Sequence, residues 1–149
     1  MRNVWLVAAG VLSAAASLLH VATIIGGPDW YRFFGAGEEM AGAAERGSFV
    51  PGAVTAAIAG MLAIWALYAF SAAGLIRRLP LLRTALVLIT GVYMLRGLAL
   101  IPLLVLKPEL GDTFAIVSSL VVLLYGITYA VGTWQAWPRL RAPSPTKPI

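Results

Sequence analysis

The sequence contains no cysteine and only one histidine among its 149 residues. The absence of cysteine excludes disulfides, thiolate metal sites and cysteine nucleophiles. A single histidine excludes most multi-histidine metal sites and leaves at most one axial haem ligand. Charge is also scarce, because 11% of the residues are charged, whereas a soluble domain carries about 25%. A water-soluble enzyme, a nucleic-acid-binding protein and a disordered chain are therefore all disfavoured.

Familiar catalytic and nucleotide-binding motifs are absent as well. The chain contains no G-x-S-x-G, phosphate-binding loop, H-E-x-x-H or C-x-x-C motif. Glu38 and Glu39 are neighbours, but adjacent helical residues point about 100° apart and do not form a catalytic dyad. We therefore predict no catalytic residue and no metal site, and the sequence favours a protein that is not an enzyme.

Apolar residues dominate what is present. They make up 60% of the chain, and its mean hydropathy is +0.88. Four apolar stretches, at about residues 4–25, 51–74, 84–106 and 114–134, are each near the ~20 residues that a helix needs to cross a bilayer. None alternates as a transmembrane strand would. The sequence predicts an all-α membrane protein, with a single four-transmembrane-helix bundle over residues 1–137.

The first stretch has an alternative interpretation as a cleaved signal peptide. Arg2 provides a basic start, and the alanines at 14–16 resemble a cleavage site. The apolar run continues to Ile25, however, which is longer than a typical signal-peptide core. We therefore interpret it as a span.

The charges predict the orientation of the bundle. Arg2, the connection that holds Arg77, Arg78 and Arg83, and the tail after Trp137 contain no acid. All six acids lie in the other two connections. The positive-inside rule then places both termini in the cytoplasm. The tail, residues 138–149, contains four prolines and is predicted to be disordered.

A short interfacial helix is predicted over about residues 28–46, between the first two spans. One helical face is apolar and the opposite face carries Arg32, Glu39 and Arg46; the apolar residues are Trp30, Phe33, Phe34, Met40, Ala41 and Ala44. This pattern is typical of a helix that lies on a membrane surface. Gly35 and Gly37 favour a split into two pieces. A lid over the mouth of the bundle is the alternative to a surface anchor.

Arg96 is the most informative polar residue. It lies about ten residues, or roughly 15 Å, from the outer end of the third span. A central arginine costs at least ~2.5 kcal/mol to insert, so we expect it to face the bundle interior with a partner. The functional hypothesis is a binding site for an anion, a carbonyl or a head group. The structural alternative is a pair that locks the helices together.

Further polar and aromatic side chains are candidates for the same site. Glu38 is the predicted charge partner of Arg96, because it lies on a flank near the outer mouth. His20, on a stripe of small and hydroxyl residues, is expected to point inward, as a structural residue or as a ligand or proton carrier. The predicted ligand-binding set is Arg96, His20, Glu38, Tyr93, Tyr125, Trp65, Tyr68 and Tyr129. The alternative for the aromatic residues is plain core packing with cation–π contacts.

The second span also carries pairs of small residues four positions apart, which allow helices to approach closely; the pairs are Ala56/Gly60, Ala59/Ala63 and Ala69/Ala73. They fit packing within the bundle or association into a homo-oligomer or a larger membrane complex.

Three segments resemble a known group of proteins. The run HVATIIGGPDWYRFFGAGEEMA, His20 to Ala41, followed by IRRLPLLR and VYMLRGL, resembles uncharacterised small four-helix inner-membrane proteins of bacteria. In size and number of helices the chain is also similar to DoxX-like proteins. The resemblance implies a bacterial inner membrane as location and implies no activity.

Three functions are compatible with these residues. The first is a membrane protein that binds a small amphiphile or anion, such as a lipid head group, a quinone-like carbonyl or a carboxylate, at Arg96. The second is a structural or accessory subunit without a ligand. The third, proton-coupled transport of a small solute, has less support because no acid lies within a span. The sequence identifies no cofactor, and the partners it predicts are the lipid bilayer and such a ligand.

Overall fold

The computed structural model describes residues 2–106 and 113–141, which form helices and no strand. The elements are α1 (Val4–Gly26), α2 (Pro28–Phe33), α3 (Glu38–Glu45), α4 (Val50–Ala73), α5 (Leu82–Leu98), α6 (Leu100–Leu106) and α7 (Thr113–Arg141). Four segments are long and apolar enough to cross a membrane, namely α1, α4, α5 together with α6, and α7. The predicted all-α class and the four long apolar helices are confirmed.

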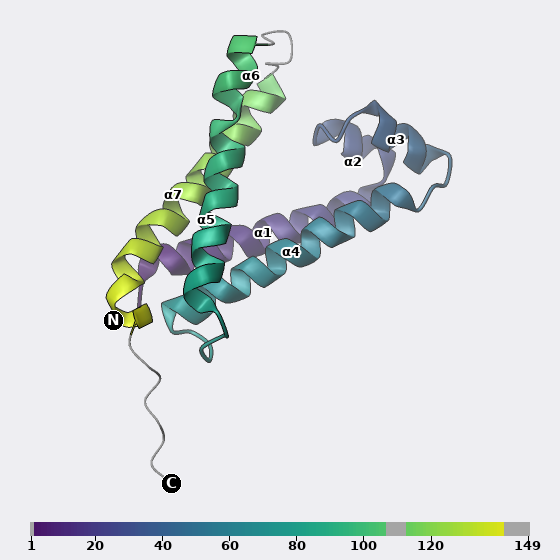
Figure 1. Ribbon diagram of the computed structural model, residues 1–149. Coiled ribbons are helices and arrows are strands. Elements are labelled where there is room, and N and C mark those ends of the chain that lie inside the picture. The colour runs from purple at the N-terminus through teal and green to yellow at the C-terminus, as the bar shows by residue number, and fades with distance from the viewer. Residues whose placement is uncertain (1, 107–112, 142–149) are drawn as a thin grey trace.

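The long helices form two antiparallel hairpins. One consists of α1 and α4 and the other of α5 and α7 (Figure 1). The hairpins cross near the end of the molecule where α1 begins and α7 ends, and they diverge toward α2 and α3 on one side and α6 on the other. We call the end that holds the start of α1, the connection 74–81 and the end of α7 the basic end. The predicted bundle is therefore a pair of crossed hairpins.

The core lies at this crossing, where apolar faces of all four long helices meet. Among its most buried members are Leu6 and Ala9 of α1, Ala69 of α4, Leu86 of α5 and Tyr129 of α7. Away from the crossing, large apolar side chains are widely exposed, as they are in helices that face lipid. The apolar surface of the chain therefore exceeds what its own packing covers.

Small residues set the distance between the paired helices. Ala59, Ala69 and Ala73 of α4 are buried, so part of the predicted small-residue pattern serves packing within the chain. In the second hairpin, a Cβ built on Gly97 of α5 would lie 2.9 Å from Cα of Leu123 in α7. Glycine at 97 therefore allows the backbones of α5 and α7 to touch.

Two predicted boundaries shift in the structure. The third span divides at Ala99, because Pro102 has no N–H to donate to the carbonyl oxygen of Leu98, where α5 ends. The fourth span continues through Pro138 to Arg141, so the helix includes the first four residues of the predicted tail. Its last turn is fixed by a hydrogen bond of 2.6 Å from Nη2 of Arg78 to the carbonyl oxygen of Leu140. The rest of the tail, residues 142–149, lies outside the described residues.

The predicted interfacial helix is divided into α2 and α3, as its glycines favoured. Gly35 and Gly37 have φ values of 65° and 92°, which interrupt the helix between Phe33 and Glu38. Phe33 is 77% exposed, as expected for a surface anchor. Gly35 lies against the ring of Phe114 in α7, so the link between α2 and α3 touches the second hairpin.

Candidate functional site

A chain of hydroxyl groups connects all four long helices at the crossing. Ser13 Oγ of α1 lies 3.1 Å from the hydroxyl of Tyr93 in α5 and 3.0 Å from that of Tyr129 in α7. The Tyr129 hydroxyl donates to the carbonyl oxygen of Trp65 in α4 at 3.0 Å. Each hydroxyl has one proton, so Ser13 donates to Tyr129 and accepts from Tyr93. The resulting order is Tyr93 to Ser13 to Tyr129 to Trp65, with every donor used.

Aromatic rings surround this chain. The ring of Tyr93 lies at the centre, with centroid distances of 4.9 Å to Trp65, 5.4 Å to Tyr129 and 5.5 Å to Tyr125. The contacts with Trp65 and Tyr125 are edge-to-face, an arrangement that stabilises aromatic pairs by about 0.5–1.5 kcal/mol. Tyr68 is partly buried against the same core. The structure therefore brings together the five aromatic residues of the predicted set.

Arg96 lies one helical turn beyond Tyr93 on α5. Its Nη1 donates to Oγ of Ser119 in α7 at 3.4 Å, a long hydrogen bond. Ser119 is only 3% exposed, whereas Arg96 itself is exposed, so the prediction that Arg96 faces the bundle interior is wrong. Tyr93 and Gly97 occupy the buried face of α5, and Arg96 lies at the edge of that face. Among the described residues, no carboxylate lies within salt-bridge distance of the guanidinium. A guanidinium has five N–H donors, so Arg96 retains the capacity to bind an anion.

The predicted pairing of Glu38 with Arg96 is wrong. Glu38 accepts two hydrogen bonds from Arg32, at 2.7 and 3.0 Å. Arg32 also contacts Glu45 at 2.8 Å and Asp29 at 3.6 Å. The break at the two glycines rotates α3 relative to α2, so the acids of α3 face Arg32. The Arg32 cluster therefore satisfies Glu38 without Arg96.

The Arg32 cluster changes the acidity of its members. Hydrogen bonds from Arg32 lower the pKa of Glu38 and that of Glu45, and the bond to Glu38 is the largest cause that raises the pKa of Arg32. A carboxylate with a lowered pKa in the folded state stabilises that state above its unfolded pKa, which is about 4.3 for glutamate. This contribution is lost as the pH falls through the lowered pKa values. The cluster therefore contributes to holding α2 against α3 at neutral pH, and this contribution weakens in acid.

His20 lies apart from the hydroxyl chain. Its Nδ1 is 2.7 Å from the carbonyl oxygen of Ala16, one turn earlier in α1. Nδ1 therefore carries the proton and donates it, which leaves Nε2 as an acceptor. No contact joins His20 to Arg96 among those of the described residues. This geometry fits the structural alternative for His20.

Two residues of the site were not in the predicted set. Ser13, on the stripe of small and hydroxyl residues that carries His20, contacts Tyr93 and Tyr129, and Ser119 accepts a hydrogen bond from Arg96. Ser119, Gly126 and Tyr129 lie on one face of α7 by helical spacing. This shared face with Tyr129 could have identified Ser119 as a site residue, whereas the position of Ser13 is also typical of a residue that only packs helices together.

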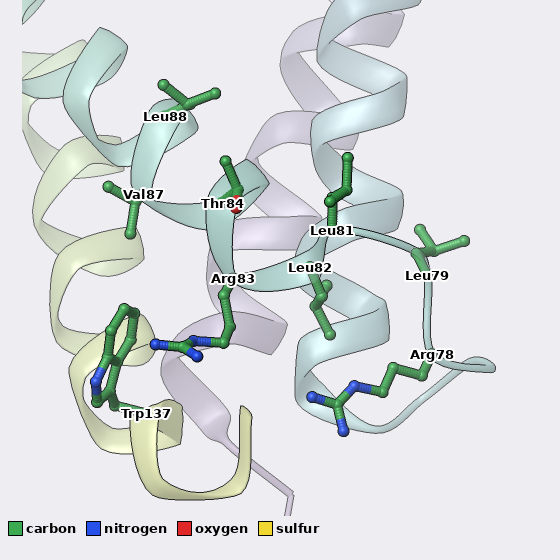
Figure 2. A pocket seen from close by; sticks show the side chains of 9 residues that line it. All are labelled: Arg78, Leu79, Leu81, Leu82, Arg83, Thr84, Val87, Leu88 and Trp137. Atoms are coloured by element: carbon green, nitrogen blue, oxygen red, sulfur yellow. The ribbon is translucent and has the colours of Figure 1, made fainter. Parts of the chain in front are cut away.

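Two surface pockets in the described part of the chain lie away from Arg96. The larger, of about 640 Å³, is at the basic end between the start of α5 and Trp137 of α7 (Figure 2). The smaller, of about 390 Å³, is lined by Asp29, Trp30, Phe33 and Phe34. Arg96 lines neither pocket.

Comparison of the chain with protein-family models, with curated proteins and with solved structures found no match. The resemblance to DoxX-like and other small four-helix membrane proteins therefore stays a prediction.

Proposed function

We propose that the protein is a multi-pass protein of the bacterial inner membrane that binds a small amphiphile or anion at Arg96. The observation that carries the proposal is the guanidinium of Arg96, which makes one long hydrogen bond to Ser119 and contacts no described carboxylate. An arginine near the middle of a span costs at least ~2.5 kcal/mol to insert into a membrane. No described carboxylate offsets this cost at Arg96, and a bound anion would do so.

The neighbouring cluster suits the rest of such a ligand. Tyr93, one turn from Arg96, is buried, and the partly exposed ring of Tyr125 packs against it. A ligand with a carboxylate, a phosphate or a quinone-like carbonyl would contact Arg96 with its polar group and the exposed part of the Tyr125 ring with its apolar part.

Mass spectrometry of the purified protein tests this proposal. Arg96→Leu is expected to lose a small molecule or lipid that the native chain retains, while its thermal stability stays equal or rises because the charge on an apolar, membrane-spanning helix is gone. Arg46→Gln is the matched control, since Arg46 is an exposed arginine at the end of α3. It should retain the bound species.

If the native chain and Arg96→Leu carry the same molecules, Arg96 is not a binding residue. If Arg96→Leu instead lowers the stability with no change in bound molecules, its role is to join α5 to α7 through Ser119. That outcome would support the structural alternative.

A structural or accessory subunit is the second candidate function. The observation that favours it is a row of small residues on α4, Ala56, Gly60 and Ala63, which is exposed on the surface of the chain. Such a row allows another transmembrane helix to approach closely.

The proposed orientation places both termini in the cytoplasm. The basic end holds the start of α1, the connection 74–81 and the end of α7 together, in agreement with one shared side for these segments (Figure 1). Reporter proteins fused after Ile149 or within the connection 77–83 should both be active in the cytoplasm. Periplasmic activity of either fusion would contradict the four-span arrangement.

A further inference from the structure

The pocket at the basic end combines positive charge with an apolar wall. Arg78 and Arg83 line it, and none of the described residues that line it is acidic. Val87 and Leu88, which are 50% and 63% exposed, form part of its wall. Figure 2 shows both guanidinium groups toward one end of the pocket, while Val87 and Leu88 continue along α5 away from them. The pocket is therefore amphiphilic along the axis of α5.

The two arginines are held in place by other residues. The guanidinium carbon of Arg83 lies 4.6 Å from the ring centroid of Trp137, a cation–π contact. The Nε atom of Arg83 is buried and has no hydrogen-bond partner. Arg78 donates to the carbonyl oxygen of Leu140. Because the side chains are already oriented, little rotamer entropy would be lost when they bind an anion.

We propose that this pocket binds the phosphodiester head group of an anionic phospholipid. The phosphate lies between Arg78 and Arg83, and an acyl chain lies along Val87 and Leu88. Arginine binds phosphate oxygens through several parallel N–H donors, and basic pockets at the cytoplasmic ends of spans bind anionic head groups. A volume of about 640 Å³ accommodates a head group with the first part of its chains.

The apolar wall of the pocket favours a phospholipid over a free phosphate ion as the ligand. A free phosphate ion would use the arginines alone and leave the apolar wall uncovered, whereas a phospholipid covers both. The proposal rests on the membrane location in the proposed function and is independent of ligand binding at Arg96.

The experiment is native mass spectrometry of the full chain released from nanodiscs that contain phosphatidylcholine with a minor fraction of phosphatidylglycerol. The native protein should retain phosphatidylglycerol in preference to phosphatidylcholine. The double variant Arg78→Gln/Arg83→Gln should retain it about 30-fold more weakly, because each basic group near a membrane surface contributes roughly a fivefold factor and the two factors multiply.

Matched variants separate the pocket from the general charge of this end. Arg2→Gln/Arg77→Gln removes two charges from the same end but none from the pocket, so it should keep the preference. Thr84→Glu places a carboxylate in the pocket at the first turn of α5, where helices favour acids, and should abolish the preference without unfolding the chain. Thr84→Gln should keep it.

Three results would overturn the proposal. They are equal retention of both lipids by the native chain, equal loss in the two double variants, and displacement of phosphatidylglycerol by millimolar inorganic phosphate. Arg96→Leu distinguishes this site from the one proposed above, since it should keep the lipid preference even if it loses another ligand. If the chain does not enter nanodiscs, the result contradicts both the proposed membrane location and the phospholipid site. If it enters nanodiscs but shows no lipid preference, the result contradicts only the phospholipid site.

Discussion

Gly97→Leu is expected to be among the most destabilising single substitutions in this chain. A Cβ at position 97 would lie 2.9 Å from Cα and 3.0 Å from N of Leu123. Because these are backbone atoms, no rotamer change can relieve the clash, and α5 must move away from α7. Overpacking of this kind costs about 1–3 kcal/mol, and we expect the upper part of that range.

Thermal unfolding of the purified variants measures this effect. Gly91→Leu is the matched control, because Gly91 lies on the same helix and a Cβ there would meet nothing within 4 Å. Leucine is also a better helix former than glycine, so the control should unfold at the native temperature or above it. Equal midpoints for the two variants would show that α5 and α7 do not touch at Gly97.

Ser13→Ala is expected to destabilise the crossing by about 1–2 kcal/mol, because it removes the acceptor of the buried Tyr93 hydroxyl. Tyr129 loses a donor but still donates to the carbonyl oxygen of Trp65. Tyr93→Phe should cost less, since it leaves no donor unpaired. The double variant Ser13→Ala/Tyr93→Phe should therefore be more stable than the sum of the single effects predicts.

The free energies of unfolding of these variants form a double-mutant cycle. Ser118→Ala is the control, because the Ser118 hydroxyl donates only within its own helix, to the carbonyl oxygen of Ala115 at 3.2 Å. Its effect should be close to zero. Strictly additive effects of Ser13→Ala and Tyr93→Phe would contradict the hydroxyl chain.

The site was partly predictable because helical periodicity places residues on faces. The deep aromatic residues Trp65, Tyr125 and Tyr129 do converge on Tyr93, whereas Arg96, predicted to face the interior, is exposed. Ser13 was missed as a site residue because a small hydroxyl residue on a packing stripe has the same pattern whether or not it bridges two phenols. Only the positions of Tyr93 and Tyr129 show that it does.

The partner of Glu38 was not predictable for a related reason. The faces of residues 28–46 were assigned on one continuous helix, which placed Arg32 opposite the apolar face together with Glu39 and Arg46. The positive φ values at Gly35 and Gly37 change the phase between α2 and α3. Arg32 then meets Glu38 and Glu45, although they lie six and thirteen residues away.

The sequence by itself determined the number of apolar helices, their approximate limits and the division of charge between the two ends. These properties depend on local composition, because the length of an apolar run and the position of its flanking charges are read without knowledge of packing. The tertiary structure decided that the helices form two crossed hairpins, that Arg96 contacts Ser119, and that Arg83 lies over Trp137 in a pocket. Every helix has a similar apolar face, so the sequence of a helix says little about which other helix it packs against. Small residues such as Gly97 and hydroxyl groups such as Ser13 determine that choice, and they act only where two helices are already in contact.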